Sequence, residues 1–384
     1  MVASTEDPAP VRVGLVGVGK MGLSHLSIVR ALSGVQIVGV CDSFGYLTDV
    51  LSKYTGLPTF AALPAMLDQA EVDALVIASP SGSHYELVAQ ALDRGIHVFC
   101  EKPLTLAAEQ SADLARRAQS ANLVSQVGYH YRYTATFAEV KQLLAQDVIG
   151  TVSHVSAQAY GPVVLREAGS TWRSKRTSGG GCLYDYAAHP LDLLQWYLGP
   201  AQRASGSILQ RIFSAETDDA VYSTLYFADE VNAQLSVNWS DESARKMTTK
   251  IAIWGERGSI YADRQEIQVY LRAGATPPPG YRAGWTVRYI TELAEPVEFY
   301  LRGEEYSAQL RAFVDAVAAR DPRAVRSSFA SAALTDAMIE MVLADSAGTS
   351  PGGATPSPRH QVASATLVHA NDGKKDRRWP WRRR

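Results

Sequence analysis

The sequence predicts an α/β protein in which a doubly wound parallel sheet is followed by a second α/β domain with a large, open, mainly antiparallel sheet. Over the first 126 residues, short apolar runs alternate with segments of helical spacing, which is typical of parallel βαβ units. A glycine-rich turn directly follows the first apolar run. Beyond residue 150, longer runs of β character are separated by turn residues, which indicates antiparallel strands.

The first domain is expected to cover residues 11–126. Its apolar runs are continuous rather than alternating, as in strands that are buried on both faces. We predict strands at residues 11–17, 35–41, 74–78, 96–100 and 124–128, with a short one near 58–61. Helices are predicted at residues 20–32, 84–94 and 106–121. Residues 1–10 form an N-terminal extension that lacks the apolar core of a signal peptide.

The second domain is expected to cover residues 127–347. We predict a helix at 137–145, strands at 152–160, 220–227, 231–239, 250–254 and 267–271, and closing helices at 304–320 and 329–347. Residues 348–384 have few large aliphatic side chains and end in a cluster of Arg and Trp. This composition predicts a disordered basic tail.

Charge is distributed unevenly along the chain, whose net charge is −2. The tail holds eight Lys or Arg and two Asp, a charge of +6, which leaves −8 for the remainder. An acidic body argues against nucleic-acid binding. The tail is either a solvated segment or a contact for an acidic partner or an anionic surface.

The cysteines Cys41, Cys100 and Cys182 are isolated from one another in the sequence. Their odd number and spacing indicate neither a disulfide framework nor a metal site. A reducing compartment, the cytoplasm, is therefore expected. The sequence contains no run of about 18 apolar residues, so no membrane span is expected.

The glycine-rich turn has the spacing GxGxxG between a strand and a helix. In this setting Gly17 permits a tight turn, Gly19 lets a pyrophosphate approach the backbone, and Gly22 lets the helix pack closely on the strand. The free N–H groups at the start of the helix then bind phosphate. We therefore predict a dinucleotide site that also includes Lys20 and Met21.

Asp42 ends the second strand, twenty residues after Gly22. A carboxylate at this place accepts hydrogen bonds from a ribose diol and repels a 2′-phosphate. Ser43 and Phe44 follow, with no Arg to receive such a phosphate. NAD is therefore expected as the cofactor in preference to NADP.

Two further strand ends should border this cofactor, because ligands bind at the carboxyl ends of parallel strands. Ser79 and Pro80 follow the third predicted strand, and His84 begins the next helix, where we expect it to pack rather than catalyse. Glu101 and Lys102 follow the next strand before Pro103, for which a cis bond is an option. An ammonium group there can polarise a substrate oxygen.

Asp185 and His189 stand four residues apart after the run Gly179–Gly181. On a helix, this spacing places both side chains on one face, one turn apart. A carboxylate at that distance can orient an imidazole and raise its pKa, which would make His189 a general base.

Several polar and aromatic residues are expected to contact the substrate. Arg173, Lys175 and Arg176 place three cations within four residues, which is typical either of a site that binds a substrate carboxylate or diphosphate or of a solvated loop. The indole of Trp172 can stack on the face of a sugar ring. The candidate contacts are Tyr129, His130, Arg132, Tyr160, Trp172 and Arg173, together with Lys102, Asp185 and His189; Lys175 and Arg176 complete the basic loop.

Five motifs occur in order: GxGxMGxxH at residues 17–25, the strand-ending Asp42, Glu-Lys-Pro at 101–103, GYxxRY at 128–133 and GGGxLxDxxxHxxD at 179–192. Together they resemble the glucose-fructose oxidoreductase / inositol dehydrogenase / rhizopine-catabolism (Gfo/Idh/MocA) family over residues of about 11 to 347. The resemblance implies a Rossmann domain, an open-sheet domain that often mediates dimers or tetramers, and Lys102, Asp185 and His189 as the catalytic group.

The function expected from this resemblance is hydride transfer between nicotinamide and a hydroxyl-bearing carbon of a sugar, sugar acid, nucleotide sugar or cyclitol. The alternatives are a non-catalytic NAD(P)-sensing regulator of the same family, or a dihydrodiol dehydrogenase or imine reductase. Retention of Lys102, Asp185 and His189 favours an enzyme. A homodimer or homotetramer is expected.

Overall fold

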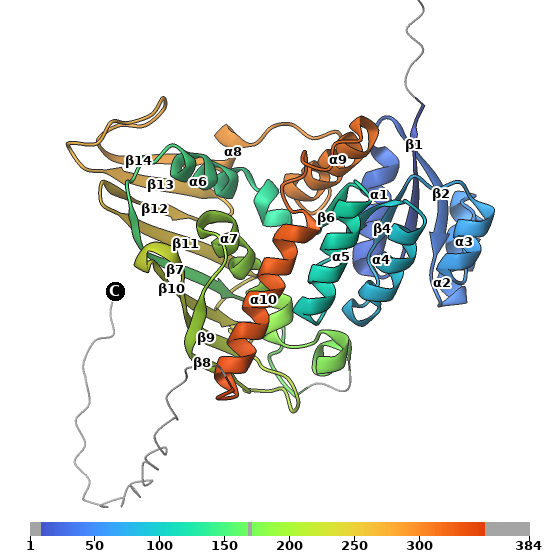
Figure 1. The fold of residues 1–384 in the computed structure, drawn as a ribbon, viewed down its shortest axis with the longest axis horizontal. Helices are drawn as coiled ribbons and strands as arrows, with labels where there is room; N and C mark the ends of the chain where they lie inside the picture. The colour runs from blue at the N-terminus through green and yellow to red at the C-terminus, as the bar shows by residue number, and fades with distance from the viewer. Residues whose placement is uncertain (1–8, 168–170, 350–384) are drawn as a thin grey trace, which may run out of the picture.

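The computed structural model describes residues 9–167 and 171–349, which fold around two sheets (Figure 1). The first has six strands in the order β3-β2-β1-β4-β5-β6, and the second has eight in the order β14-β13-β12-β11-β7-β10-β9-β8. None of the described helices is long and apolar enough to cross a membrane.

The first sheet is entirely parallel, which confirms the doubly wound prediction. Its order reverses between β1 and β4, and a ligand crevice is expected at such a switch point. The strands are β1 (Val11–Val16), β2 (Val35–Cys41), β3 (Thr59–Phe60), β4 (Ala74–Ile77), β5 (His97–Cys100) and β6 (Ser125–Val127). The helices are α1 (Lys20–Ala31), α2 (Gly45–Thr55), α3 (Leu63–Gln69), α4 (His84–Asp93) and α5 (Ala108–Ser120); α2 and α3 were not predicted.

The second sheet is mainly antiparallel, as predicted, with one parallel pairing between β7 and β10. Its strands are β7 (Val152–Tyr160), β8 (Arg203–Gln210), β9 (Ala220–Tyr226), β10 (Asn232–Asn238), β11 (Thr248–Gly255), β12 (Gly258–Ala262), β13 (Glu266–Leu271) and β14 (Gly284–Tyr289). Of these, β8, β12 and β14 were not predicted. The helices of this part are α6 (Ala135–Ala145), α7 (Ala188–Leu198) and α8 (Ile290–Leu293).

One face of the second sheet is covered by α6, α7 and α10 (Phe329–Ser346), and no helix of residues 9–167 and 171–349 covers the other, which we call the open face (Figure 1). Strand β7 shows the division clearly. Val155, Ala157 and Ala159 are buried under the helices, while the intervening side chains are only half-buried. Successive side chains of a strand point to opposite faces, so Ser156 and Tyr160 belong to the open face.

The two closing helices connect the sheets to each other. Helix α9 (Glu304–Ala319) packs against α1. Its Phe313 lies edge-on to Phe99 of β5, with the ring centroids 5.9 Å apart. Helix α10 contacts α5 of the first part as well as α7 and β8 of the second. The division at residue 126 therefore stays a prediction, because α9 contributes to the core of the first part. Most of the predicted extension (1–10) and tail (348–384) lies outside the described residues.

Candidate active site

The glycine turn after β1 is shaped for a ligand that lies against its backbone. Gly17 has a φ of +94°, and its N–H donates to the carbonyl of Cys41 at 2.8 Å. A side chain on Gly22 would overlap the carbonyl oxygen of Gly17, so helix and turn approach too closely for any other residue. A Cβ on Gly19 would meet nothing within 4 Å. Gly19 therefore faces open space, where a pyrophosphate fits.

Asp42 braces this turn from the end of β2. Its Oδ2 accepts the N–H of Val18 at 2.7 Å, and its Oδ1 accepts the N–H of Phe44 at 2.8 Å. Helix α1 begins after Gly19 without a side-chain cap, so its first N–H groups are available for phosphate. The residues present fit a dinucleotide, whose phosphates would lie at Gly19 and Lys20 and whose adenosine ribose would lie at Asp42.

Ser79 and His84 form hydrogen bonds at the carboxyl end of β4. The Ser79 hydroxyl lies 2.8 Å from that of Ser83. His84 is fully buried, with its ring nitrogens 2.9 Å from the Pro103 carbonyl and 3.0 Å from the Ser79 carbonyl. Burial lowers the pKa of His84. His84 thus packs between the chain after β4 and the chain after β5.

Glu101 makes a contact that the sequence analysis did not assign. Its Oε1 lies 2.6 Å from Nε2 of His25, a buried residue of α1. Burial alone would raise the pKa of Glu101, but the hydrogen bond and charge of His25 outweigh it and the pKa is lowered. The only sign of this pair in the sequence was the position of His25 in the GxGxMGxxH motif.

Lys102, which follows β5, is held against Asp185 of the helical turn Leu183–Ala187. Its Nζ donates to the Asp185 carboxylate Oδ1 and to the Asp185 main-chain oxygen, both at 2.8 Å. The side chains are 13% and 17% exposed, so the pair is partly shielded but still reachable. The Lys102–Pro103 peptide bond is cis.

The predicted pairing of Asp185 with His189 is wrong in this structure. Asp185 lies in a π-helical turn, Leu183–Ala187, that runs into α7, so the helical prediction holds for the backbone. The carboxylate, however, is bound by Lys102 at Oδ1 and by Arg173 Nε at Oδ2, at 3.2 Å. Both oxygens are thus bound to cations, which compete better for a carboxylate than a neutral imidazole does.

His189 is 5% exposed and is surrounded by aromatic rings. The ring centroids of His130, Tyr131 and Tyr129 lie 4.8, 5.0 and 6.4 Å from that of His189. Its Nδ1 is buried without a hydrogen-bond partner among the described residues. Burial, together with the charges of Lys102 and Arg264, lowers the pKa of His189 well below its usual value, the opposite of the predicted rise. The imidazole is therefore neutral at neutral pH.

Arg132 does not face the crevice, which corrects its prediction as a substrate contact. Its Nε and one terminal nitrogen bind both oxygens of Asp192 at 2.9 and 2.6 Å, and the side chains are 2% and 1% exposed. Two further N–H groups reach the carbonyl of Arg326 at 2.7 Å and Gln195 Oε1 at 2.8 Å. Four of the five N–H groups of the guanidinium are thus bonded inside the protein.

Residues 11–129 of this chain match the Gfo/Idh/MocA group described as "Oxidoreductase family, NAD-binding Rossmann fold". Residues 137–261 match the GFO/IDH/MocA C-terminal domain. The chain belongs to the Gfo/Idh/MocA oxidoreductase family. Its first part is an NAD-binding Rossmann domain.

Among characterised relatives, the rhizopine catabolism protein MocA of Rhizobium meliloti is 27% identical over 84% of this chain and 92% of its own length. The inositol 2-dehydrogenase of Rhizobium meliloti (strain 1021) is 26% identical over 78% of this chain and 90% of its own length. A solved levoglucosan dehydrogenase in complex with NADH superposes with a TM-score of 0.77 over 89% of this chain and 98% of its own, at 20% identity, which shows a shared fold.

The other predicted substrate contacts of this Gfo/Idh/MocA protein divide into two groups. Tyr129 and His130 lie beside His189, and His130 stacks on Tyr306 with the ring centroids 4.5 Å apart. Burial lowers the pKa of His130 well below its usual value. Tyr160, by contrast, lies on the open face of the second sheet, with its hydroxyl 2.6 Å from that of Ser236 on β10. The substrate prediction for Tyr160 is therefore wrong.

The two arginines of the basic loop each face an acidic side chain. Arg173 binds Asp185, with its guanidinium 4.5 Å from the ring centroid of Trp172, and Arg176 lies 3.6 Å from Asp218 Oδ1. Lys175 is exposed. The loop also approaches the turn after β4, because a Cβ on Gly82 would lie 3.2 Å from the Thr177 carbonyl oxygen.

Asp218 is the main site residue that the sequence analysis missed. Its Oδ2 accepts the N–H of Leu183 at 2.7 Å, and its main-chain oxygen accepts the N–H of Cys182 at 2.8 Å. Gly181 has a φ of +111°, and a Cβ there would lie 2.7 Å from Asp218 Oδ1. Asp218 thus fixes the start of the turn that carries Asp185. The only sign in the sequence was the acidic pair Asp218–Asp219 directly before an apolar strand.

Proposed function

We propose that this protein is an NAD-dependent dehydrogenase that transfers a hydride between nicotinamide and a hydroxyl-bearing carbon of a sugar or related polyol. The observation that carries the proposal is the Lys102–Asp185 contact beside His189, at the carboxyl end of β5 and near the glycine turn. Preference for NAD over NADP is proposed from Asp42, whose carboxylate repels a 2′-phosphate.

In the direction of oxidation, His189 takes the hydroxyl proton. It does so at Nε2, because Nδ1 is enclosed by the protein. Lys102 hydrogen-bonds the same substrate oxygen and stabilises the negative charge that develops there. Asp185 keeps the Lys102 ammonium aimed at that oxygen. Bound nicotinamide supplies a hydride acceptor at C4, so the carbinol loses a hydride and a proton and becomes a carbonyl.

Uncharged sugars and cyclitols are proposed as the first substrates to test. Arg173 and Arg176 are each paired with a carboxylate, Asp185 and Asp218, so neither guanidinium is free to bind a substrate carboxylate or diphosphate. The names of the relatives point in the same direction, since one is an inositol 2-dehydrogenase. Sugar acids and nucleotide sugars remain within the proposed class.

The test is a dehydrogenase screen that follows NADH absorbance with inositols, free sugars, sugar acids and nucleotide sugars. We expect turnover with at least one class, and a loss of about 10²- to 10⁴-fold in kcat for His189→Ala, with the Kd for NADH nearly unchanged. Near-normal turnover in His189→Ala would overturn the role of His189. Tight NADH binding without turnover of any class would favour a regulatory protein.

We further propose that the open face of the second sheet associates with a second copy of the chain. Aromatic side chains continue across neighbouring strands, with ring centroids of Trp254–Tyr261 and Tyr261–Trp285 each 5.8 Å apart and Tyr270–Trp285 5.3 Å apart. Trp285 is 49% exposed and Tyr270 39%. Exposed aromatic patches of this kind mark protein interfaces.

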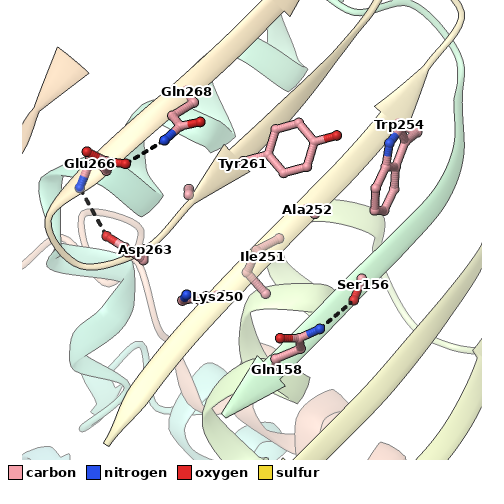
Figure 2. A pocket seen from close by; sticks show the side chains of 11 residues that line it. Ser156, Gln158, Lys250, Ile251, Ala252, Trp254, Tyr261, Asp263, Glu266 and Gln268 are labelled. Carbon is pink, nitrogen blue, oxygen red and sulfur yellow. Dashed lines mark hydrogen bonds between the residues drawn. The ribbon is translucent and has the colours of Figure 1, made fainter. Parts of the chain in front are cut away.

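A hollow on this face supports the choice of a second copy. Figure 2 shows the charged side chains Lys250, Asp263 and Glu266 toward one end of it and the aromatic side chains Tyr261 and Trp254 toward the other. A copy related by two-fold symmetry presents the same patch, so each Lys250 is offered acidic side chains.

Light scattering coupled to size exclusion tests this association. We expect wild type to have at least twice the mass of one chain, and Trp285→Glu to shift toward the monomer with unchanged circular dichroism. Tyr54→Glu is the matched control, because Tyr54 is 77% exposed on α2, far from the second sheet in sequence and fold. A monomeric wild type, or equal masses for wild type and Trp285→Glu, would contradict the proposal.

A further inference from the structure

Arg173 occupies the oxygen of Asp185 that Lys102 leaves free. Lys102 Nζ lies 2.8 Å from Oδ1, and Arg173 Nε lies 3.2 Å from Oδ2. We infer that Arg173 is a positioning residue that clamps the Asp185 carboxylate so that its other oxygen aims the Lys102 ammonium at the substrate. This inference rests on the proposed dehydrogenase function and assigns Arg173 a role other than a direct substrate contact.

The loop that carries Arg173 is itself tightly fixed. Thr171 and Ser174 form a capping box around the short helix Trp172–Ser174. The carbonyl of Arg173 accepts a hydrogen bond from Thr217 Oγ1 at 3.3 Å. Any side chain on Gly180 would overlap this same carbonyl. The backbone of Arg173 therefore has a defined place relative to the glycine run, which a free surface loop would not need.

The guanidinium group is also oriented. Its carbon lies 4.5 Å from the ring centroid of Trp172, and the Arg173 side chain is 43% exposed while Asp185 is 17% exposed. Stacking on the indole fixes the plane of the guanidinium and leaves Nε directed at Asp185. Trp172 and Asp185 thus hold Arg173 from two sides, and Arg173 in turn holds Asp185.

The charges around Asp185 explain what the clamp does. The titratable and charged groups facing it are Lys102 from the end of β5, Arg173 from the loop, and Cys182 and Tyr186 from its own turn. Burial alone would raise the pKa of Asp185, but the two cations outweigh it and the pKa is lowered. Two cations and one carboxylate leave one positive charge, which suits an oxygen that becomes negative in the transition state.

Loss of Arg173 would free Oδ2 and let the carboxylate rotate away from Lys102. The misdirected ammonium would then stabilise the transition state less, whereas binding of the ground state would change little. The carboxylate would also be protonated at a higher pH, because one of the two cations that lower its pKa is absent. These effects differ from those of a lost substrate or cofactor contact.

The test compares Arg173→Met, Arg173→Lys and wild type, with Lys175→Met as the control for loss of a cation from the same loop. For a substrate found in the screen, we expect Arg173→Met to lower kcat by about 10- to 100-fold while KM and the Kd for NADH stay within about twofold of wild type. The acidic limb of its kcat/KM profile should move to higher pH. Arg173→Lys should recover part of kcat, and Lys175→Met should behave like wild type.

A rise in KM or in the Kd for NADH with unchanged kcat would overturn the inference, because it would place Arg173 on a ligand. A second readout does not depend on turnover. In protein labelled with ¹³C at the aspartate carboxyls, the Asp185 signal, assigned by its loss in Asp185→Asn, should titrate at higher pH in Arg173→Met than in wild type. An unchanged midpoint would overturn the clamp, whereas absence of turnover with every substrate would contradict only the proposed function.

Discussion

The Nζ of Lys102 lies 2.8 Å from both the carboxylate Oδ1 and the main-chain oxygen of Asp185. The contact joins the end of β5, a strand of the first sheet, to the helical turn Leu183–Ala187, which packs against β9 and β10 of the second sheet. Two of the three N–H groups of the Lys102 ammonium are bonded to Asp185, which fixes the position of the ammonium. The direction of the third N–H group is then set by the fold, and we place the reacting oxygen there.

Replacement of Lys102 by methionine should remove this oriented donor. We expect kcat to fall by about 10²- to 10³-fold, the usual effect of losing one hydrogen-bond donor to a developing oxyanion, while NADH still binds. Steady-state kinetics and NADH fluorescence measure the two quantities. Lys53→Met, which removes a lysine from α2, is the control and should match wild type. A Lys102→Met enzyme with near-normal kcat would exclude Lys102 from the chemistry.

The acidic side of the pH–rate profile should reflect the neutral state of His189. Only the neutral imidazole accepts a proton, and burial with the charges of Lys102 and Arg264 lowers its pKa well below 6.5. The active form thus persists as pH falls through 6.5. We expect kcat/KM for oxidation to be level from about pH 6.5 to 8 and to decline only at lower pH. A decline that begins above pH 7 would show that the imidazole is charged more readily than its burial implies.

Asp42 should decide between the two nicotinamide dinucleotides. Asp42→Asn keeps the size of the side chain and one acceptor for the N–H groups of Val18 and Phe44, but removes the charge that repels a 2′-phosphate. We expect the Kd for NADPH to improve relative to that for NADH by about five- to tenfold, measured by fluorescence titration. Asp49→Asn, an exposed acid on α2, should leave the ratio unchanged. Equal ratios in Asp42→Asn and wild type would place selectivity elsewhere.

Arg132 should prove to be a stability residue. Removing one partner of a buried ion pair leaves the other charge without compensation, so Arg132→Met should lower the free energy of unfolding by about 3–5 kcal/mol. Arg116→Met, which breaks an exposed pair with Asp113, should cost less than about 1 kcal/mol. Urea unfolding of both variants provides the measurement. A stable Arg132→Met protein with a raised KM would return Arg132 to the substrate crevice.

The buried parts of the fold could be predicted from the sequence because their patterns are local. Strands β1, β2, β4 and β5 are continuous apolar runs, and a sheet buried on both faces requires them. Strands β8, β12 and β14 were missed, since they are interrupted by glycine or alternate polar with apolar residues, as in Gly284–Tyr289. Their strand character depends on neighbours in the second sheet rather than on their own composition.

The identity of the site residues was more predictable than their partners. Spacing placed Asp185 and His189 on one helical stretch, but it could not show that two cations from other segments occupy the carboxylate. Arg132 and Tyr160 looked like crevice residues because of their types and positions near domain starts and strand ends. One is bound to Asp192 inside the protein, and the other points to the opposite face of the sheet. Such errors arise where tertiary contacts choose the direction of a side chain.

Helix α9 has a consequence for the order in which the protein is made. Phe313 and Leu310 of this helix help to cover the same apolar layer as Phe99 and Leu26, which belong to the first hundred residues. A nascent chain that has emerged only as far as β6 can form the glycine turn but leaves this layer open to water. The nucleotide-binding half therefore completes its core only after the whole second sheet has been synthesised.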